Sequence, residues 1–272
     1  MCAMEHNSIS VTVLGARGSV PVSGKSFSRY GGATTCALFC ACGQYVVIDA
    51  GTGLMSLPEE AMLVSPLPLL LTHAHVDHLL GLPLSSCTMR KGFKLDIYAA
   101  NHSGLNAQEQ VESLLSPPLW PVGPAHLPAD IAFHELKQTM SLGAVGVKTL
   151  AGRHPGGVSL LRLEAAGKSA VFATDCTLDD GFLPRFAEFI KGCDLLLCDG
   201  QYCDEEWKNR EHFGHNSWEF AARFAQEQGV ERLRIIHHDP RRTDEQLERE
   251  AEKLRPMGAD YDFAKEGETI AL

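Results

Sequence analysis

The chain is short of positive charge and has no long apolar run. Its 272 residues carry 24 Lys and Arg against 34 Asp and Glu, which gives a net charge of -10. A protein that follows long nucleic acid neutralises many phosphates with a basic face, so this balance argues against such a partner. No apolar segment reaches the roughly 20 residues of a membrane span, so we expect no membrane insertion.

A secretory leader and a complete set of cysteine pairs are also missing. The first seven residues show no leader pattern, and one of the nine cysteines cannot pair. Cys40 and Cys42 lie too close together in a strand-like run to bridge each other. We therefore expect reduced thiols and a cytoplasmic location.

The composition suits one sizeable core. Hydrophobic residues make up 44% of the chain, and no short-period repeat divides it. We therefore expect a single domain over residues 1–272, as a monomer or a homodimer.

One short stretch organises the chain. Residues 67–71 form an apolar run that ends in Thr-His-Ala-His-Val-Asp-His at residues 72–78. A buried strand that stops there would present His73, His75, Asp77 and His78 together, and Zn²⁺ and similar ions bind such donors. The alternative is a polar turn, but Ser, Asn or Gly would serve a turn better. The pattern therefore favours a metal site.

Other strand-like runs also lead to a His or an Asp. Such residues are Asp49 after residues 46–48, His154 after 145–150, Asp175 after 169–174, Asp199 after 195–198, and His237 after 233–236. Strand ends at one sheet edge converge in space, so these scattered side chains can form one site. The Asp49 carboxylate either caps a helix or orients a metal ligand.

Three arginines are candidates for binding an anionic substrate. Arg17 lies in the Gly-rich segment 15–21, Arg29 precedes Tyr-Gly-Gly, and Arg153 precedes His154. A guanidinium matches the geometry of anionic oxygens. Ordinary turns with hydrated arginines are the alternative, and the spacing does not decide between them.

Two helices are signalled near the carboxyl end. We expect one over residues 216–229, capped by Asn216, and another over residues 243–254 that starts with Thr-x-x-Gln. Residues 268–272 read as an edge strand. Elsewhere, we expect His6, His102, His126 and His134 to be surface or core residues.

The ordered set His73-x-His75-x-Asp77-His78, His154, Asp175 and His237 resembles the ligand pattern of the metallo-β-lactamase superfamily, over nearly the whole chain. The resemblance implies an α/β (α+β) fold, the αββα sandwich, with two facing mixed sheets and helices outside. It implies one metal held by His73, His75 and His154, another by Asp77, His78 and His237, and Asp175 bridging them. Asp49 resembles the carboxylate that orients a ligand, and His238 is the rival of His237.

The resemblance also implies the chemistry. Asp175 stands where the β-lactamase branch commonly has Cys, and His75 stands where the diiron oxidoreductase branch has Glu, which favours hydrolysis over redox chemistry. The implied cofactors are two divalent ions, Zn²⁺ before Mn²⁺ or Fe²⁺. Cys176 reads as a small core residue.

Residues 213–219, Phe-Gly-His-Asn-Ser-Trp-Glu, are similar to the Gly-His-Ser-Thr segment of the phosphodiesterase branch, which includes ribonuclease Z. Asn216 and Ala33 depart from the usual Ser and Asn of that branch. The expected reaction is hydrolysis of a small cyclic or linear phosphodiester by a metal-bridging hydroxide. Asp77 and Asp49 support the metals in that reaction, and His215 is the candidate proton donor.

Three other functions stay open. One is hydrolysis of a carboxylic ester, lactone or thioester, and another is metal binding without turnover. The third is endonucleolytic processing of tRNA 3′ ends, which we rank below phosphodiester hydrolysis because residues 79–153 contain no long basic Gly-rich module.

Overall fold

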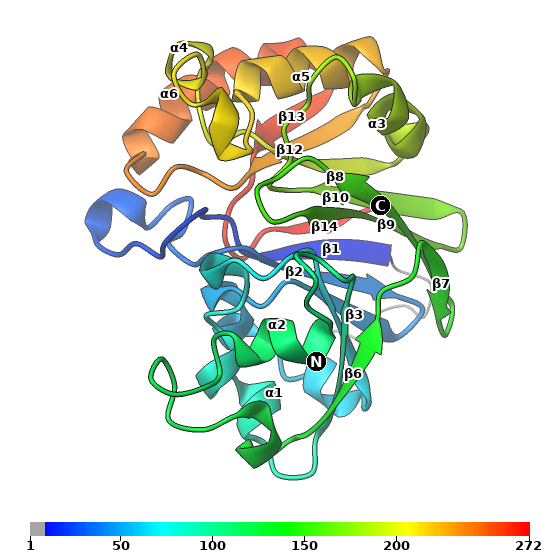
Figure 1. Cartoon of the computed structure of the whole chain (residues 1–272). Helices are drawn as coiled ribbons and strands as arrows, with labels where there is room; N and C mark the ends of the chain where they lie inside the picture. The colour runs from blue at the N-terminus through cyan, green and yellow to red at the C-terminus, as the bar shows by residue number, and fades with distance from the viewer. Residues whose placement is uncertain (1–8) are drawn as a thin grey trace.

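The computed structural model describes residues 9–272, and the predictions about the amino-terminal leader and His6 lie outside the described residues. Two seven-stranded mixed sheets face each other, and helices cover the outer side of each sheet (Figure 1). The predicted αββα sandwich is therefore confirmed.

The first sheet has the strand order β14-β1-β2-β3-β4-β5-β6. Its strands are β1 (Ile9–Gly15), β2 (Cys36–Ala41), β3 (Gln44–Ile48), β4 (Leu67–Leu71), β5 (Lys94–Ala99), β6 (Asp130–Glu135) and β14 (Thr269–Ala271). Strands β3 to β6 run parallel, and the neighbours on the β1 side pair antiparallel.

The second sheet has the order β13-β12-β11-β10-β9-β8-β7. Its strands are β7 (Thr139–Leu142), β8 (Val145–Gly152), β9 (Val158–Ala165), β10 (Lys168–Ala173), β11 (Leu195–Asp199), β12 (Arg232–Ile236) and β13 (Asp260–Phe263). Strands β10 to β13 run parallel, and β7 to β10 pair antiparallel. Each sheet thus has one parallel and one antiparallel half.

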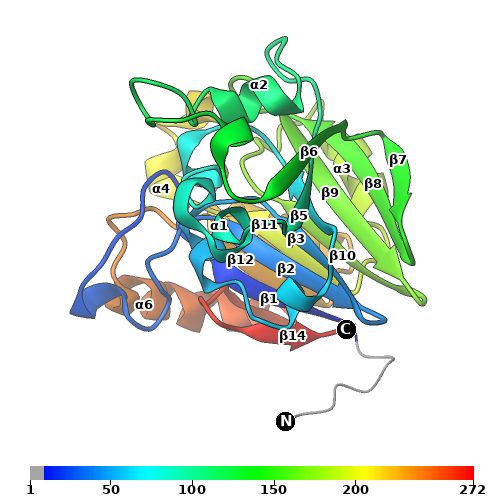
Figure 2. The same cartoon turned by 90° about the horizontal axis from the view of Figure 1, so that it is seen from below.

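The helices lie outside the two sheets. They are α1 (Ser86–Met89), α2 (Ala107–Glu112), α3 (Leu183–Ile190), α4 (Asp204–Trp207), α5 (Trp218–Glu227) and α6 (Asp244–Leu254). Short 3-10 turns are η1 (Lys25–Phe27), η2 (Thr52–Ser56), η3 (Ala61–Leu63), η4 (Val76–His78), η5 (Leu82–Leu84), η6 (Pro124–His126), η7 (Glu211–Phe213) and η8 (Arg255–Met257). Figure 1 shows α1 and α2 below the first sheet and α3 and α6 above the second, and Figure 2 gives the view from below, onto the side that carries α1.

The strands alternate between two cores, because successive side chains point to opposite faces of a sheet. In β3, Val46 and Ile48 pack between the sheets, whereas Val47 packs under the helices of the first sheet. In β11, Leu195 packs between the sheets, and Leu196 packs under the helices of the second sheet. The central strands are buried on both faces, which explains their nearly continuous apolar sequences, whereas β6 and β7 at the sheet edges are largely exposed.

The predicted carboxyl-terminal elements are present, with one correction. Thr243 caps α6 in a capping box with Gln246, and β14 occupies the predicted edge. The prediction that Asn216 caps α5 is wrong: Ser217 is the cap and accepts a hydrogen bond from the amide of Phe220. Among the helices of residues 9–272, none has the length and hydropathy needed to cross a bilayer.

Candidate metal centre

Strand β4 delivers the first ligand candidates to the edge of the first sheet. Its leucines are almost all fully buried, and the chain leaves the strand at Thr72 and His73. The 3-10 turn η4 then turns Asp77 and His78 inward, where both are buried. An apolar strand followed by a tight turn therefore brings four donor residues to the same sheet edge: His73, His75, Asp77 and His78.

The first ligand group contains His73, His75 and His154, whose nitrogens lie within 4.8 Å of one another. Nε2 of His154 lies 3.0 Å from Nδ1 of His75. Burial lowers the pKa of His73 and His75, and it lowers the pKa of His154 to about 4. These imidazoles are therefore neutral near pH 7, as metal ligands must be.

The second ligand group contains Asp77, His78, Asp175 and His237, and all four are buried. Nε2 of His237 lies 3.1 Å from Oδ2 of Asp77 and 3.1 Å from Oδ1 of Asp175. Burial alone would lower the pKa of His237, but the Asp175 and Asp77 carboxylates outweigh it and raise that pKa to about 9. A divalent cation could replace the proton that these carboxylates hold on the imidazole.

The Asp175 carboxylate lies between the two groups. Its Oδ2 is 3.2 Å from Nε2 of His78 in the second group. Its Oδ1 is 3.9 Å from Nε2 of His73 and 3.7 Å from Nε2 of His154 in the first group. Asp175 is therefore placed where a ligand shared by two metals would lie.

The ring nitrogens that face the cluster are left available for a metal. Nε2 of His73 and Nε2 of His78 are buried and, within the described part of the chain, have no hydrogen-bond partner. The opposite nitrogens are engaged, since Nδ1 of His73 lies 3.1 Å from Oγ1 of Thr72 and Nδ1 of His78 lies 2.8 Å from Oδ2 of Asp49. Such partners fix the tautomer and aim the lone pair of the other nitrogen at an ion, so this donor set fits two divalent metals.

Asp49 belongs to neither group, and its carboxylate lies against the His78 ring. It is fully buried, and it also accepts hydrogen bonds from the amide and hydroxyl of Thr72. In the same way, the carbonyl of Gly214 lies 3.1 Å from Nδ1 of His154. Spacing along the chain does not reveal the contacts of Asp49 with Thr72 and of His154 with Gly214, because each joins residues that are distant in sequence.

Three of these residues adopt the left-handed backbone region that favours glycine. Asp49, Asp175 and His237 have φ values of 56°, 54° and 65°. Asp49 follows β3, Asp175 follows Thr174 at the end of β10, and His237 follows β12. At each strand end the positive φ turns the chain sharply. Non-glycine residues in this region gather at functional sites, where the surrounding structure holds them.

His215 lies beside the second group. Its Nδ1 is 2.8 Å from Oδ2 of Asp199, and its ring stacks on His237 at 4.8 Å between centroids. Oδ1 of Asp199 also accepts a hydrogen bond from the amide of Asn216. Asp199 was visible in the sequence as a strand-end residue, but its partnership with His215 could not be deduced from spacing.

The structure places His237, and not His238, in the cluster. Nε2 of His238 donates to the carbonyl of Ala264, and its ring packs against Tyr30 and Phe263. Cys176 is a core residue, as expected, and burial raises the pKa of its thiol to about 12.

Of the three arginines, Arg17 does not act as predicted. It is fully buried, and its guanidinium donates to the carbonyls of Gly31, Asp239 and Arg242. We therefore assign Arg17 to joining the β1 loop to the segment after His237, and not to binding substrate.

Arg29 and Arg153 are half-exposed and each faces a carboxylate. Arg29 lies 4.0 Å from Glu248 of α6, and Arg153 pairs with Asp179. Neither guanidinium is brought among the metal-ligand candidates.

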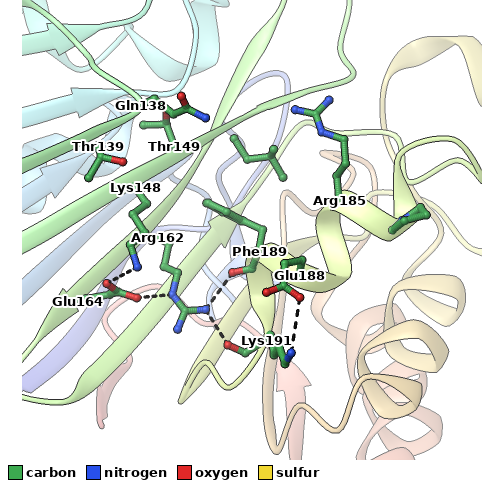
Figure 3. A pocket seen from close by; sticks show the side chains of 12 residues that line it. Gln138, Thr139, Lys148, Thr149, Arg162, Glu164, Arg185, Glu188, Phe189 and Lys191 are labelled. Atoms are coloured by element: carbon green, nitrogen blue, oxygen red, sulfur yellow. Dashed lines mark hydrogen bonds and ion pairs between the residues drawn. The ribbon is translucent and has the colours of Figure 1, made fainter.

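A wide hollow of about 750 Å³ lies elsewhere, on the outer face of β8 and β9 beside α3 (Figure 3). Five of its six charged side chains form ion pairs with one another. Glu164 pairs with Lys148 at 2.9 Å and with Arg162 at 2.7 Å, and Lys191 lies 3.6 Å from Glu188. This hollow contains none of the ligand candidates.

We predict that Asp49→Asn weakens zinc binding about 10- to 100-fold, because the amide is a poorer partner for Nδ1 of His78. The measurement is competition between the metal-free protein and a chelator of known affinity. Asp96→Asn is the matched control, since Asp96 lies 3.5 Å from His134 on the first sheet and outside both ligand groups. Wild-type zinc affinity in Asp49→Asn would contradict the orienting role.

Comparisons with known proteins agree with this geometry. The family model described as "Beta-lactamase superfamily domain" matches residues 44–238. A ribonuclease Z of Bradyrhizobium diazoefficiens is 24% identical over 304 aligned positions, which cover 93% of this chain and 98% of the relative.

Solved structures show the same fold. The metallo-β-lactamase fold protein YhfI of Bacillus subtilis has a TM-score of 0.68 and 21% identity, over 98% of this chain and 100% of that one. A diphosphatase of the PhnP family has a TM-score of 0.67 and 18% identity, over 97% of each chain. The chain belongs to the metallo-β-lactamase superfamily, and its His and Asp ligand candidates lie together at one sheet edge.

Proposed function

We propose that this metal-dependent hydrolase cleaves a small cyclic or linear phosphodiester. The observation that carries the proposal is the position of Asp175 between two ligand groups, with His215 beside the second group. Two divalent ions held there would supply an activated water at neutral pH and positive charge for the phosphate oxygens. The donors are imidazoles and carboxylates without a thiolate, which suits Zn²⁺, with Mn²⁺ or Fe²⁺ as alternatives.

His215 is the proposed proton donor. Asp199 accepts the hydrogen on Nδ1, so a protonated His215 has Nε2–H available for the leaving oxygen. Bracing of the α5 start is the alternative role, and Asn216 and Ser217 already supply contacts there.

Asp77 and Asp49 have separate supporting tasks. Oδ2 of Asp77 accepts a hydrogen bond from the amide of Ser19 at 2.7 Å while facing His237. It thus ties the first loop of the chain to the second ligand group. Asp49 holds the His78 ring from the opposite side.

The names of the relatives favour a phosphoester over a carboxylic ester, lactone or thioester. Ribonuclease Z and a PhnP-family diphosphatase are both named for cleaving bonds to phosphorus. The ribonuclease name also favours a second candidate function, cleavage of RNA. The net charge of -10 and the folding of residues 79–153 into α1, β5, α2 and β6 to β8 support the smaller substrate.

A cytoplasmic location is part of the proposal. Eight cysteines of the described chain are free, which is the usual state of thiols in a reducing compartment.

The function is tested with a substrate panel. Protein loaded with Zn²⁺ or Mn²⁺ is assayed with a chromogenic phosphodiester, a short RNA, a thioester and a lactone. We expect the highest kcat/KM for the phosphodiester. A higher value for the thioester or lactone, or for RNA alone, would replace the proposed substrate class.

His215→Ala is expected to slow phosphodiesters with poor leaving groups far more than those with good ones. Positioned acids contribute about 10²- to 10⁴-fold, and a good leaving group needs little protonation. The measurement is kcat for aryl and alkyl esters of one phosphate series, together with bound metal. His212→Ala, an exposed histidine of η7, is the matched control. Equal slowing across the series would refute proton donation.

A further inference from the structure

A small hollow of about 190 Å³ adjoins the first ligand group on its outer side. It lies between residues 100–106, which follow β5, and residues 155–157, which follow His154. Its walls include His73 and His75 on one side, Ser103 and Leu105 on another, and Gly156 and Gly157 on a third. Because His73 and His75 are metal-ligand candidates, a group bound in this hollow would lie next to a phosphate held by the metals.

The hollow is held in shape by hydrogen bonds on both sides. The hydroxyl of Ser103 donates to the carbonyl of Gly156 at 2.9 Å, and Nε2 of His102 lies 3.0 Å from the hydroxyl of Ser159. These two contacts join the loop after β5 to the loop after His154 and to the start of β9. His102 was expected to be a surface or core residue, and it is instead a half-buried part of this wall.

The buried side-chain amide of Gln110 holds the loop of residues 100–106 in place. Its Nε2 donates to the carbonyl of Ala100 at 2.6 Å and to the carbonyl of Leu105 at 2.8 Å. Ser103, between them, has a φ of 53°, a strained value that these contacts maintain. The loop is therefore a preformed wall.

Two consecutive glycines keep the hollow open. Gly156 and Gly157 have φ values of +87° and +92°. A Cβ on Gly156 would lie 3.5 Å from the Ser103 hydroxyl and 3.9 Å from Nε2 of His75, and a Cβ on Gly157 would lie 2.7 Å from Nδ1 of His102. Side chains at these positions would enter the hollow or collide with its wall.

The size and chemistry of the walls indicate what fits. A cavity of roughly 150 Å³ is large enough to bind benzene, so this volume suits one ring with small substituents. Within the described chain, no Lys, Arg, Asp or Glu lines the hollow, and its polar groups are hydroxyl, amide and imidazole. The group that fits is a neutral ring with hydrogen-bonding substituents, such as a sugar.

We propose that this hollow binds the ester arm that stays on phosphorus and selects a neutral arm whose first ring is a sugar, as in a nucleoside. This inference rests on the proposed phosphodiesterase function. The His215 ring lies 4.8 Å from the His237 ring and 5.3 Å from the His154 ring, between centroids, whereas the hollow is lined by His73 and His75. The leaving group and the retained arm would therefore extend from the phosphate in different directions.

The test compares two diesters that share a p-nitrophenolate leaving group and differ in the retained arm, methyl or thymidine 5′-yl. Leu105 is a rim residue with 37% of its surface exposed, so it tolerates substitution. Leu105→Trp fills the hollow and Leu105→Ala widens it. We expect Leu105→Trp to lower the ratio of kcat/KM for the thymidine ester to kcat/KM for the methyl ester by about tenfold, and Leu105→Ala to leave it the same or raise it.

Leu63→Trp is the matched control, since Leu63 is 78% exposed in η3 and lines no part of the hollow. If Leu105→Trp fails to fold, Ser103→Asn takes its place. Asn tolerates the positive φ of residue 103, and its larger side chain reduces the volume of the same hollow. An unchanged ratio in the folded variant, or an equal fall in both Leu105 variants, would overturn the inference. Absence of wild-type turnover of both diesters would instead overturn the proposed function.

Discussion

The buried carboxylate of Asp175 is the constraint on which the site depends. It is 2% exposed and surrounded by imidazoles of both ligand groups. A buried charge costs several kcal/mol unless a nearby opposite charge compensates it. Burial lowers the pKa values of His78 and His237, but the Asp175 and Asp77 carboxylates outweigh burial and raise both values. These carboxylates therefore favour positive charge at this place. Two divalent cations would provide that charge, and the neutral histidines of the first group would supply ligands to one of them.

The sandwich makes this concentration of donors possible. The parallel halves of the two sheets bring β3, β4, β10, β11 and β12 to one edge, and the apolar core between the sheets fixes their spacing. Asp49, Asp175 and His237 are held there in strained backbone conformations, which cost of order 1–3 kcal/mol each. Packing of both sheets can offset this strain, whereas an isolated loop could not. The site is therefore a property of the whole sandwich.

The sequence allowed the sheet edge and the donors to be predicted, because both depend on local pattern. Apolar runs that end in His or Asp mark strand ends, and the fold prediction followed from their order. Arg17 was misjudged because burial by distant segments decides its role, and local spacing does not report burial. Ser217 replaces Asn216 as the cap of α5 because the Asn216 side chain accepts a hydrogen bond from the Leu178 amide. The place of His102 beside His75 depends on two loops meeting, which no local pattern reveals.

The most direct test is anomalous diffraction from crystals of the protein loaded with zinc. The account predicts two ions that share the Asp175 carboxylate, one also bound by His73, His75 and His154, the other by Asp77, His78 and His237. A single ion, or ions bound away from Asp175, would contradict the central claim that this carboxylate joins two metal sites.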